Sequence, residues 1–374
     1  MGTDHKPEWS DPNNPESCSS IVRKGEELEG QAASIEKNIH FQKRISSEPT
    51  VEELYEGVIK GDRSILARAI TLVESNAEQH FKKAQQLLQK LLHKSGKSIR
   101  IGITGVPGAG KSTFIESFGT YLCSLGHQVA VLAIDPSSSI SGGSILGDKT
   151  RMEQLSRNPR AFIRPSPTAG KLGGVHRKTR EAMLLCEAAG FDVILIETVG
   201  VGQSEVIIRD MVDFFMLLVL TGAGDELQGM KKGIMELADA ILVHKADGAN
   251  KPKAEQTRNE YNRILHFLQP ATKGWTTKAY TCSSLTHEGI SEIWNVIQSF
   301  EQIGKMSGVF DNRRKNQARE WLFSMITDQL QFHFYHHKGV KSELPKLENK
   351  VIAGETTVAS AVETLFNTFL AIKE

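Results

Sequence analysis

The chain has 374 residues, which is more than one ordinary domain needs and fewer than three domains would take. Hydrophobic residues make up 39% of it and charged residues 24%, so it has enough apolar surface to close a sizeable core and enough charge to stay in solution. Lys and Arg together number 45 against 44 for Asp and Glu, which excludes a global electrostatic attraction to nucleic acid or to an anionic membrane. We expect a packed globular protein that recognises its partners locally.

The spacing of the cysteines and the length of the apolar runs indicate the cellular compartment of the protein. The four cysteines lie far apart and form no C-x-x-C pair, which is typical neither of a zinc site nor of a disulfide framework (Cys18, Cys123, Cys186 and Cys282). The longest apolar run, Phe214 to Leu220, is much shorter than the roughly 20 residues of a membrane-spanning helix. The N-terminus has no apolar run of the kind that a secretory signal needs. These features predict a cytoplasmic protein without a membrane-spanning segment.

Two regions precede the predicted core. Residues 1–45 carry scattered charges, Ser, Pro and Gly with few large apolar side chains, so we expect a flexible segment. In residues 46–95 apolar side chains recur at helical spacing, as at Leu54 and Val58 and again at Leu66 and Ile70. The pattern predicts two or three amphipathic helices, with a break at Gly61-Asp62 between the first two.

Residues 96–303 alternate short apolar runs with helical stretches. Several of the runs are apolar throughout, which is typical of strands buried on both faces. The predicted strands are Ile99 to Thr104, Val129 to Ile134, Val193 to Glu197, Phe214 to Thr221, Ala240 to His244 and Ala279 to Cys282. Buried strands separated by helices predict an α/β fold with a doubly wound, mostly parallel sheet.

Residues 304–374 are predicted to be helical, with helices over Gln317 to Tyr335 and Thr357 to Ile372. One apolar stripe runs along the first of them, at Ala318, Leu322, Met325, Ile326 and Leu330. The segment is too short to bury this stripe in a core of its own, so we expect the stripe to pack across a two-fold axis.

The motif G-x-x-x-x-G-K-[ST] follows the first predicted strand and precedes a helix, the context that a phosphate-binding loop needs. The loop spans Gly105, Val106, Pro107, Gly108, Ala109, Gly110, Lys111, Ser112 and Thr113. Its glycines let backbone N–H groups surround phosphates, Lys111 reaches the terminal phosphates and Ser112 binds magnesium. The alternative is a glycine-rich turn with a chance lysine, which the flanking strand and helix disfavour.

A second motif ends the strand Val193 to Glu197. A carboxylate at the tip of such a strand, as in Glu197, faces the nucleotide crevice and can hold magnesium, while the N–H of Gly200 can meet the terminal phosphate. Asp135, at the tip of another strand, is a candidate of the same kind, and two such acids suit one octahedral ion. The alternative is an acid that only caps a strand end.

The third motif, His244-Lys245-Ala246-Asp247, resembles the N-K-x-D element that binds guanine. Asp247 can accept hydrogen bonds from guanine, whereas it would face a lone pair of adenine. His244 stands where Asn is usual, and one imidazole N–H cannot copy both functions of an amide, so we expect weaker guanine selection. The loop Ser283-Ser284-Leu285 follows the last strand, at a place where loop amides often contact the guanine carbonyl, and is a further candidate for the base site. The alternative is a surface Lys and Asp with no ligand.

Taken together, the passages GVPGAGKST, AIDPSSSISGGSILGDKTRM, DVILIETVGVGQSE and LTGAGDELQGMKKGIMELAD resemble the methylmalonyl-CoA mutase-associated G-protein chaperones. These form the MeaB and ArgK group within the signal-recognition-particle and MinD-like class of P-loop GTPases. The resemblance implies that Ser112, Asp135 and Glu197 surround Mg²⁺, with Asp148 nearby in a first switch. It implies a second switch at 199–205 and a third at 222–232. The polar members of the third switch, Asp225, Gln228 and Lys231, join Lys111 and Glu197 as catalytic candidates.

The resemblance further implies a homodimer that binds GTP, GDP and Mg²⁺ and gates the delivery of adenosylcobalamin to a B12-dependent acyl-CoA mutase such as methylmalonyl-CoA mutase. It also implies protection or reactivation of that mutase. Two alternatives stay open. One is an ATPase or kinase linked to lysine, arginine and ornithine transport, although no substrate pocket is recognisable. The other is a metallochaperone GTPase, although the sequence has no His-rich or Cys-rich tract to hold the ion.

Overall fold

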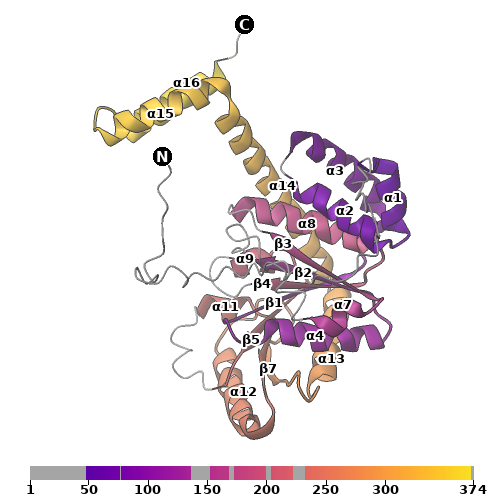
Figure 1. Ribbon diagram of the computed structural model, residues 1–374. Helices are drawn as coiled ribbons and strands as arrows, with labels where there is room; N and C mark the ends of the chain where they lie inside the picture. The colour runs from indigo at the N-terminus through magenta and orange to yellow at the C-terminus, as the bar shows by residue number, and fades with distance from the viewer. Residues whose placement is uncertain are drawn as a thin grey trace, which may run out of the picture. The chain divides into compact units, whose positions relative to one another are not determined.

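The computed structural model describes residues 48–75, 77–135, 152–167, 172–198, 204–221 and 232–371 (Figure 1). The chain divides into two compact units, Met1–Glu48 and Pro49–Glu374, and the architecture below is that of the second. The predicted flexible segment 1–45 lies outside the described residues. None of the helices in the described ranges is both long enough and apolar enough to cross a membrane.

A seven-stranded sheet forms the centre of this unit, in the order β3-β2-β4-β1-β5-β6-β7. Every strand pairs with its neighbours in the parallel direction. The strands are β1 Ile99–Gly105, β2 Val129–Asp135, β3 Ala161–Pro167, β4 Val193–Thr198, β5 Phe214–Val219, β6 Ala240–Val243 and β7 Lys278–Thr281. The predicted parallel α/β sheet is therefore confirmed, and because β1 lies between β4 and β5, the loop after β1 opens at the middle of the carboxyl edge.

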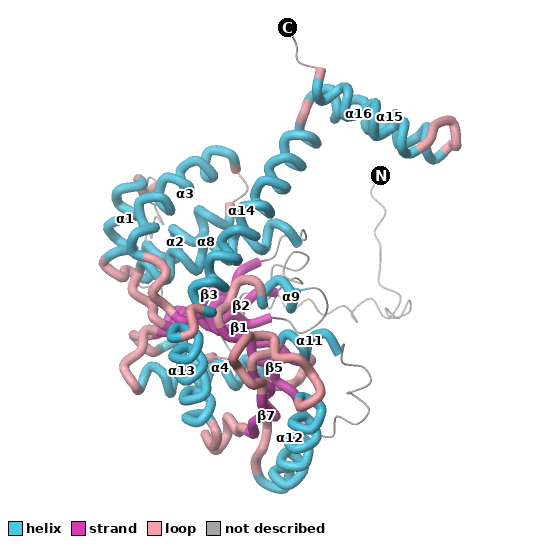
Figure 2. The backbone as a smooth tube through the Cα atoms, turned by 180° about the vertical axis from the view of Figure 1, so that it is seen from behind, coloured by secondary structure: helices cyan, strands magenta, loops and turns pink. Residues whose placement is uncertain are grey.

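Helices cover both faces of the sheet, which explains why the strands are apolar throughout (Figures 1 and 2). Val193 and Leu195 join one buried cluster with α4 (Lys111–Ser124) and α13 (Ile290–Met306). The alternate residues Ile194 and Ile196 join a second cluster with α8 (Leu172–Ala188) and the N-terminal helices. The remaining described elements of the sheet region are α7 (Glu153–Arg157), α9 (Ser204–Arg209), α11 (Lys232–Leu237), the 3₁₀ turn η2 (Gly248–Asn250) and α12 (Lys251–Leu265).

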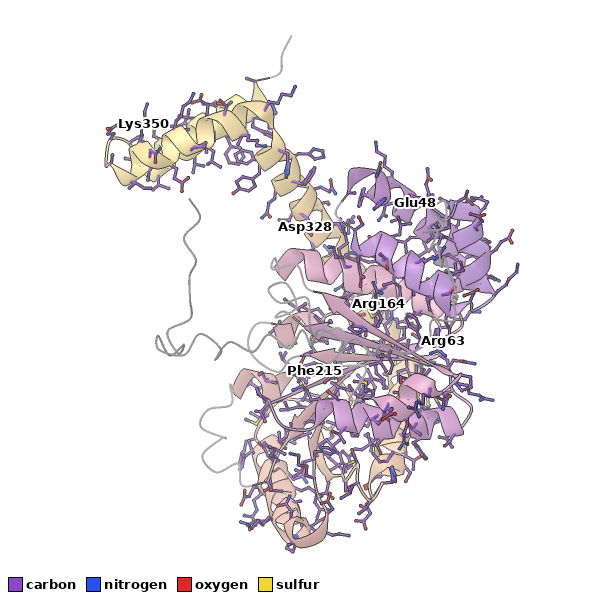
Figure 3. All side chains as sticks on the ribbon, in the orientation of Figure 1. Glu48, Arg63, Arg164, Phe215, Asp328 and Lys350 are labelled. Carbon is purple, nitrogen blue, oxygen red and sulfur yellow. The ribbon has the colours of Figure 1, made fainter. Side chains whose placement is uncertain are left out.

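The predicted N-terminal helices are present as α1 (Val51–Ile59), α2 (Arg63–Glu74) and α3 (Glu78–Leu91), followed by the 3₁₀ turn η1 (Leu92–Lys94). A capping box between Thr50 and Glu53 begins α1, and the Asp62 side chain accepts from two backbone N–H groups at the start of α2. Between these two helices Gly61 has φ 73°, so the predicted helix break at Gly61-Asp62 is confirmed. Arg164 of β3, labelled in Figure 3, forms an ion pair with Glu74 of α2 and ties these helices to the sheet.

The C-terminal part contains α14 (Val309–His336), α15 (Lys338–Ile352) and α16 (Val358–Leu370). The first half of α14 is anchored at the amino edge of the sheet, opposite the carboxyl edge. There the guanidinium of Arg314 forms two hydrogen bonds, 2.9 and 2.6 Å long, with the fully buried carboxylate of Asp213, the residue before β5. The amide of Gln317 donates to Val212 O over 2.7 Å. At the other end of α14, the ring of Phe334 packs against Phe366 and Phe369 of α16.

Some predicted boundaries were wrong. The sequence did not predict β3 or α15, and α14 begins at Val309 rather than at Gln317. The apolar stripe on α14 lacks a partner within the described chain, since Leu322, Ile326 and Leu330 are 59%, 45% and 60% exposed. Asp328 and Lys350 mark α14 and α15 in Figure 3, whereas Phe215 lies inside the sheet.

Candidate functional site

The loop between β1 and α4 has the backbone of a phosphate-binding loop. Gly105 ends β1, and a Cβ there would lie 2.3 Å from the carbonyl oxygen of Leu218, so no larger residue fits. Gly108 and Gly110 have φ values of 81° and 87°, in the left-handed region that favours glycine. Gly110 caps a helix of 14 residues, and no side chain caps that first turn in the described structure. The N–H groups at the start of α4 therefore provide a site for an anion.

The Lys111 side chain lies along this loop and is buried. Its Nζ donates to the carbonyl oxygens of Gly105 at 2.9 Å and Val106 at 3.3 Å. Both acceptors belong to the loop itself, so the ammonium group is held where a bound phosphate chain would meet the same backbone.

Ser112 and Glu197 meet at the ends of two adjacent strands. Glu197 of β4 pairs with Ile103 of β1, which brings its carboxylate to the first turn of α4. Ser112 Oγ donates to Glu197 Oε1 over 2.8 Å, and the glutamate is buried. A hydroxyl and a carboxylate are oxygen donors of the kind that Mg²⁺ prefers, so these residues fit the ion.

A hydrogen bond that the sequence did not reveal holds these strand ends together. The hydroxyl of Thr198 donates to that of Thr104 over 2.8 Å, and both side chains are buried. Asp135 lies at the same edge, because its neighbour Ile134 pairs with Thr198. The backbone of Asp135 is described as the last residue of β2, but its side chain lies outside the described part.

His244 lies between the phosphate-binding loop and the loop after β7. The ring is 2% exposed, Nδ1 lies 2.7 Å from Ala109 O and Nε2 lies 2.7 Å from Ser284 Oγ. Burial lowers the pKa of His244 most strongly, and the charge of Lys245 lowers it further. The imidazole is therefore neutral at pH 7 and has one donor and one acceptor.

Asp247 and Ser283 are hydrogen-bonded to one another at the candidate base site. Ser283 Oγ donates to Asp247 Oδ2 over 2.6 Å and accepts from the N–H groups of Leu285 and Thr286 at 3.2 and 3.1 Å. These bonds fix the loop after β7 around a half-buried carboxylate. Leu285, within this loop, is 80% exposed.

Asn250 is a positioning residue that sequence reasoning missed. Its Nδ2 donates to Lys245 O and its Oδ1 accepts from Thr221 Oγ1, each over 2.7 Å. Lys245 has φ 59°, an unusual value for a residue with a side chain, and this bond helps to hold it. A polar residue three positions after Asp247 was the available signal.

Five predicted site residues lie outside the described residues. They are Asp148, Gly200, Asp225, Gln228 and Lys231. The structure brings together the other members, except for the side chain of Asp135. These residues follow one another along the carboxyl edge of the sheet. Ser112 and Glu197 lie near β4 and β1, His244 lies between the phosphate-binding loop and the loop after β7, and Asp247 lies beyond β6.

Comparisons with known proteins agree with this geometry. The family described as methylmalonyl Co-A mutase-associated GTPase MeaB matches residues 66–338. A putative GTPase of Caulobacter vibrioides is 52% identical over 319 residues, covering 85% of this chain and 98% of the relative. The mitochondrial methylmalonic aciduria type A homolog of Mus musculus is 45% identical over 329 residues, covering 85% of this chain and 79% of the relative. The crystal structure of a LAO/AO transport system kinase is 36% identical, with a TM-score of 0.67, and the match covers 85% of this chain and 96% of that one.

The parallel sheet and the loop after β1 define a P-loop GTPase fold, and the protein is a GTP hydrolase. The chain belongs to the methylmalonyl Co-A mutase-associated GTPase family, MeaB.

Proposed function

We propose that the protein is a magnesium-dependent GTP switch that gates adenosylcobalamin delivery to an acyl-CoA mutase such as methylmalonyl-CoA mutase, and that protects or reactivates this enzyme. The observation that carries the proposal is the match of residues 66–338 to a mutase-associated GTPase family. The contact of 2.8 Å between Ser112 and Glu197 supports the magnesium site within that match.

The proposed roles follow the geometry of the carboxyl edge. The loop Gly105 to Thr113 binds the phosphates, Lys111 neutralises the charge that develops on them, and Ser112, Glu197 and Asp135 hold Mg²⁺ together with Asp148. Bound Mg²⁺ would stabilise the negative charge of the transferring phosphoryl group. Gly200 meets the terminal phosphate, and Lys245 and Asp247 bind guanine with the loop Ser283 to Leu285. Asp225, Gln228 and Lys231 connect the third switch to the partner.

The proposed organisation is a GTPase domain over 96–303, helical additions over 46–95 and 304–374, and a homodimer formed through the exposed stripe on α14. An exposed stripe of large apolar side chains is costly in water, and a second copy of the same helix would cover it. The buried free cysteines Cys123, Cys186 and Cys282 are compatible with a reducing compartment such as the cytoplasm.

The rival function is that of an ATPase or kinase linked to amino-acid transport, and the related crystal structure is named a LAO/AO transport system kinase. Transfer of the γ-phosphate of ATP to a protein or amino acid would support this rival. Hydrolysis of GTP to free phosphate, with ATP left unchanged, would support the switch.

A direct test is capture of adenosylcobalamin-loaded methylmalonyl-CoA mutase on the immobilised protein, with a non-hydrolysable GTP analogue, with GDP or without nucleotide. We expect retention of the mutase to depend on the nucleotide, because only contacts to the γ-phosphate distinguish the switch arrangements. The Lys111→Ala variant is the control and should lose this dependence. Equal retention in all three conditions, or none in any, would contradict the proposal.

A further inference from the structure

His244 stands where guanine-binding proteins usually carry an asparagine, but its geometry gives it another task. We propose that His244 is a positioning residue that ties the phosphate-binding loop to the loop after β7, and that it does not read the base. Guanine selection then rests on Asp247. This inference deepens the proposed nucleotide site and rests on it.

The hydrogen bonds determine the tautomer of the ring. The carbonyl oxygen of Ala109 can only accept, so the Nδ1 atom that lies 2.7 Å from it carries the proton. In the neutral ring Nε2 is then the acceptor, and the hydroxyl of Ser284 donates to it over 2.7 Å. Both ring nitrogens are used within the protein, and neither is left to bond a nucleobase.

Packing holds the ring in this place. A Cβ on Gly110 would lie 2.7 Å from Nδ1 and 2.8 Å from Cε1 of His244, so the ring lies directly against the backbone of the phosphate-binding loop. Its other neighbour is the Phe114 ring of α4, at 6.0 Å and 80° in an edge-to-face contact. The ring, one residue beyond the end of β6, therefore lies between the start of α4 and the loop after β7.

The reach of the side chain explains why an imidazole suits this gap. In His the Nε2 atom is three bonds from Cβ, whereas both polar atoms of Asn are two bonds from Cβ. An asparagine could replace the bond to Ala109 O and leave Ser284 unpaired. Glutamine has its polar atoms three bonds from Cβ, so it could replace the bond to Ser284 and leave Ala109 O unpaired. The imidazole ring can bond to both loops at once, whereas the amide of Asn or Gln could bond to only one of them.

The test measures GDP and ADP affinity by calorimetry for the wild type, His244→Ala, Ser284→Ala and the double variant. We expect the affinities for GDP and ADP to fall by the same factor within each variant, about 3- to 10-fold in Ser284→Ala, which loses one hydrogen bond, and more in His244→Ala, which loses both. The double variant should be no weaker than the weaker single variant, because the two residues act through one contact. The Asp247→Asn control should lose the preference for GDP.

Two results would overturn the inference. A fall in the GDP-to-ADP preference of His244→Ala as large as that of Asp247→Asn would show that the histidine reads the base. Multiplicative losses in the double variant would show that the two residues do not act through one contact. If instead the wild type itself binds GDP and ADP equally, the proposed guanine site fails, and this outcome is distinct from either of the other two. The ¹⁵N shifts of the imidazole give an independent readout and should report a protonated Nδ1 with and without GDP.

Discussion

The hydroxyl of Ser112 donates to the carboxylate of Glu197 over 2.8 Å, across the junction of β4 and α4. Two oxygen ligands that approach one another this closely can bind one cation together, and the hydroxyl bond orients the carboxylate toward it. The structure therefore couples the phosphate-binding loop to the strand that leads into the second predicted switch.

Replacing Glu197 with Gln tests this relationship. The amide keeps the shape and can still accept from Ser112, but it removes one negative charge from the metal site. We expect the magnesium concentration for half-maximal GTP hydrolysis to rise by about 10- to 100-fold. The thermal midpoint should stay within about 2 °C in magnesium-free buffer, because the amide fills the same space and still accepts from Ser112. An unchanged magnesium requirement would remove Glu197 from the proposed ligand set.

Replacing Asp247 with Asn should change the preferred base. A carboxylate accepts from the N1–H and the exocyclic amine of guanine, whereas an amide can donate to the C2 carbonyl that xanthine carries in place of that amine. We expect GDP affinity to fall by about 10- to 100-fold, since the matched pair is worth about 1 to 3 kcal/mol, and xanthosine diphosphate to become the better ligand. Competition against a fluorescent nucleotide measures both. If Asp247→Asn prefers GDP as strongly as the wild type does, the nucleobase does not bind at Asp247.

The buried Glu181 of α8 should make stability depend on pH. Burial raises the pKa of its carboxyl group to about 6, while the charge of Arg177 and a hydrogen bond of 2.8 Å from Gln85 act in the opposite direction. Because the folded state holds the proton more tightly, this contribution to stability is fully present below about pH 4.5 and is lost as the pH rises to about 6.

Glutamine at position 181 cannot ionise, so Glu181→Gln should gain about 2 kcal/mol relative to the wild type between pH 4.5 and pH 7.5. Urea unfolding at the two pH values measures the difference, and Glu153→Gln on the exposed side of α7 controls for the loss of one charge. A stability difference between Glu181→Gln and the wild type that does not change with pH would show that folding leaves the pKa of Glu181 unchanged.

The stripe on α14 predicts assembly. Leu322→Glu combined with Ile326→Glu should convert a dimer to a monomer in multi-angle light scattering, because each charge would be buried in the interface without a partner. Glu320→Gln, on the same helix outside the stripe, should leave the dimer intact. Point substitutions suit this test better than truncation at the start of α14, since Phe310 and Gln317 are buried against the GTPase core. A wild-type monomer at micromolar concentration would refute the proposed interface.

The sequence predicted the parallel sheet and the loop Gly105 to Thr113 because apolar runs and glycine spacing are local signals. It missed β3, whose residues AFIRPSP include Pro165 and Pro167, since prolines indicate a loop and are tolerated in an edge strand. It missed α15, which contains Gly339 and Pro345 within a single helix. The first half of α14 was missed for a different reason, because polar contacts such as that of Arg314 with Asp213 hold it and leave no apolar period to recognise.

The sequence indicated candidate site residues one by one, but it could not indicate the hydrogen bonds among them. Nothing in the letters His-Lys-Ala-Asp indicates that both nitrogens of His244 bond to other loops, since Ala109 and Ser284 are far away in the sequence. The bond between Thr104 and Thr198 is equally invisible, because it depends on which strands become neighbours.

The rate of GTP hydrolysis with and without adenosylcobalamin-loaded methylmalonyl-CoA mutase tests the central claim most directly. A partner that orders polar groups around the transferring phosphate lowers the barrier, so the account predicts a slow basal rate and an increase of about 10-fold or more at saturating mutase. Lys111→Ala should show neither the basal nor the stimulated rate. A wild-type rate that stays the same at saturating mutase, while GTP is hydrolysed normally, would contradict a GTPase that works on this enzyme.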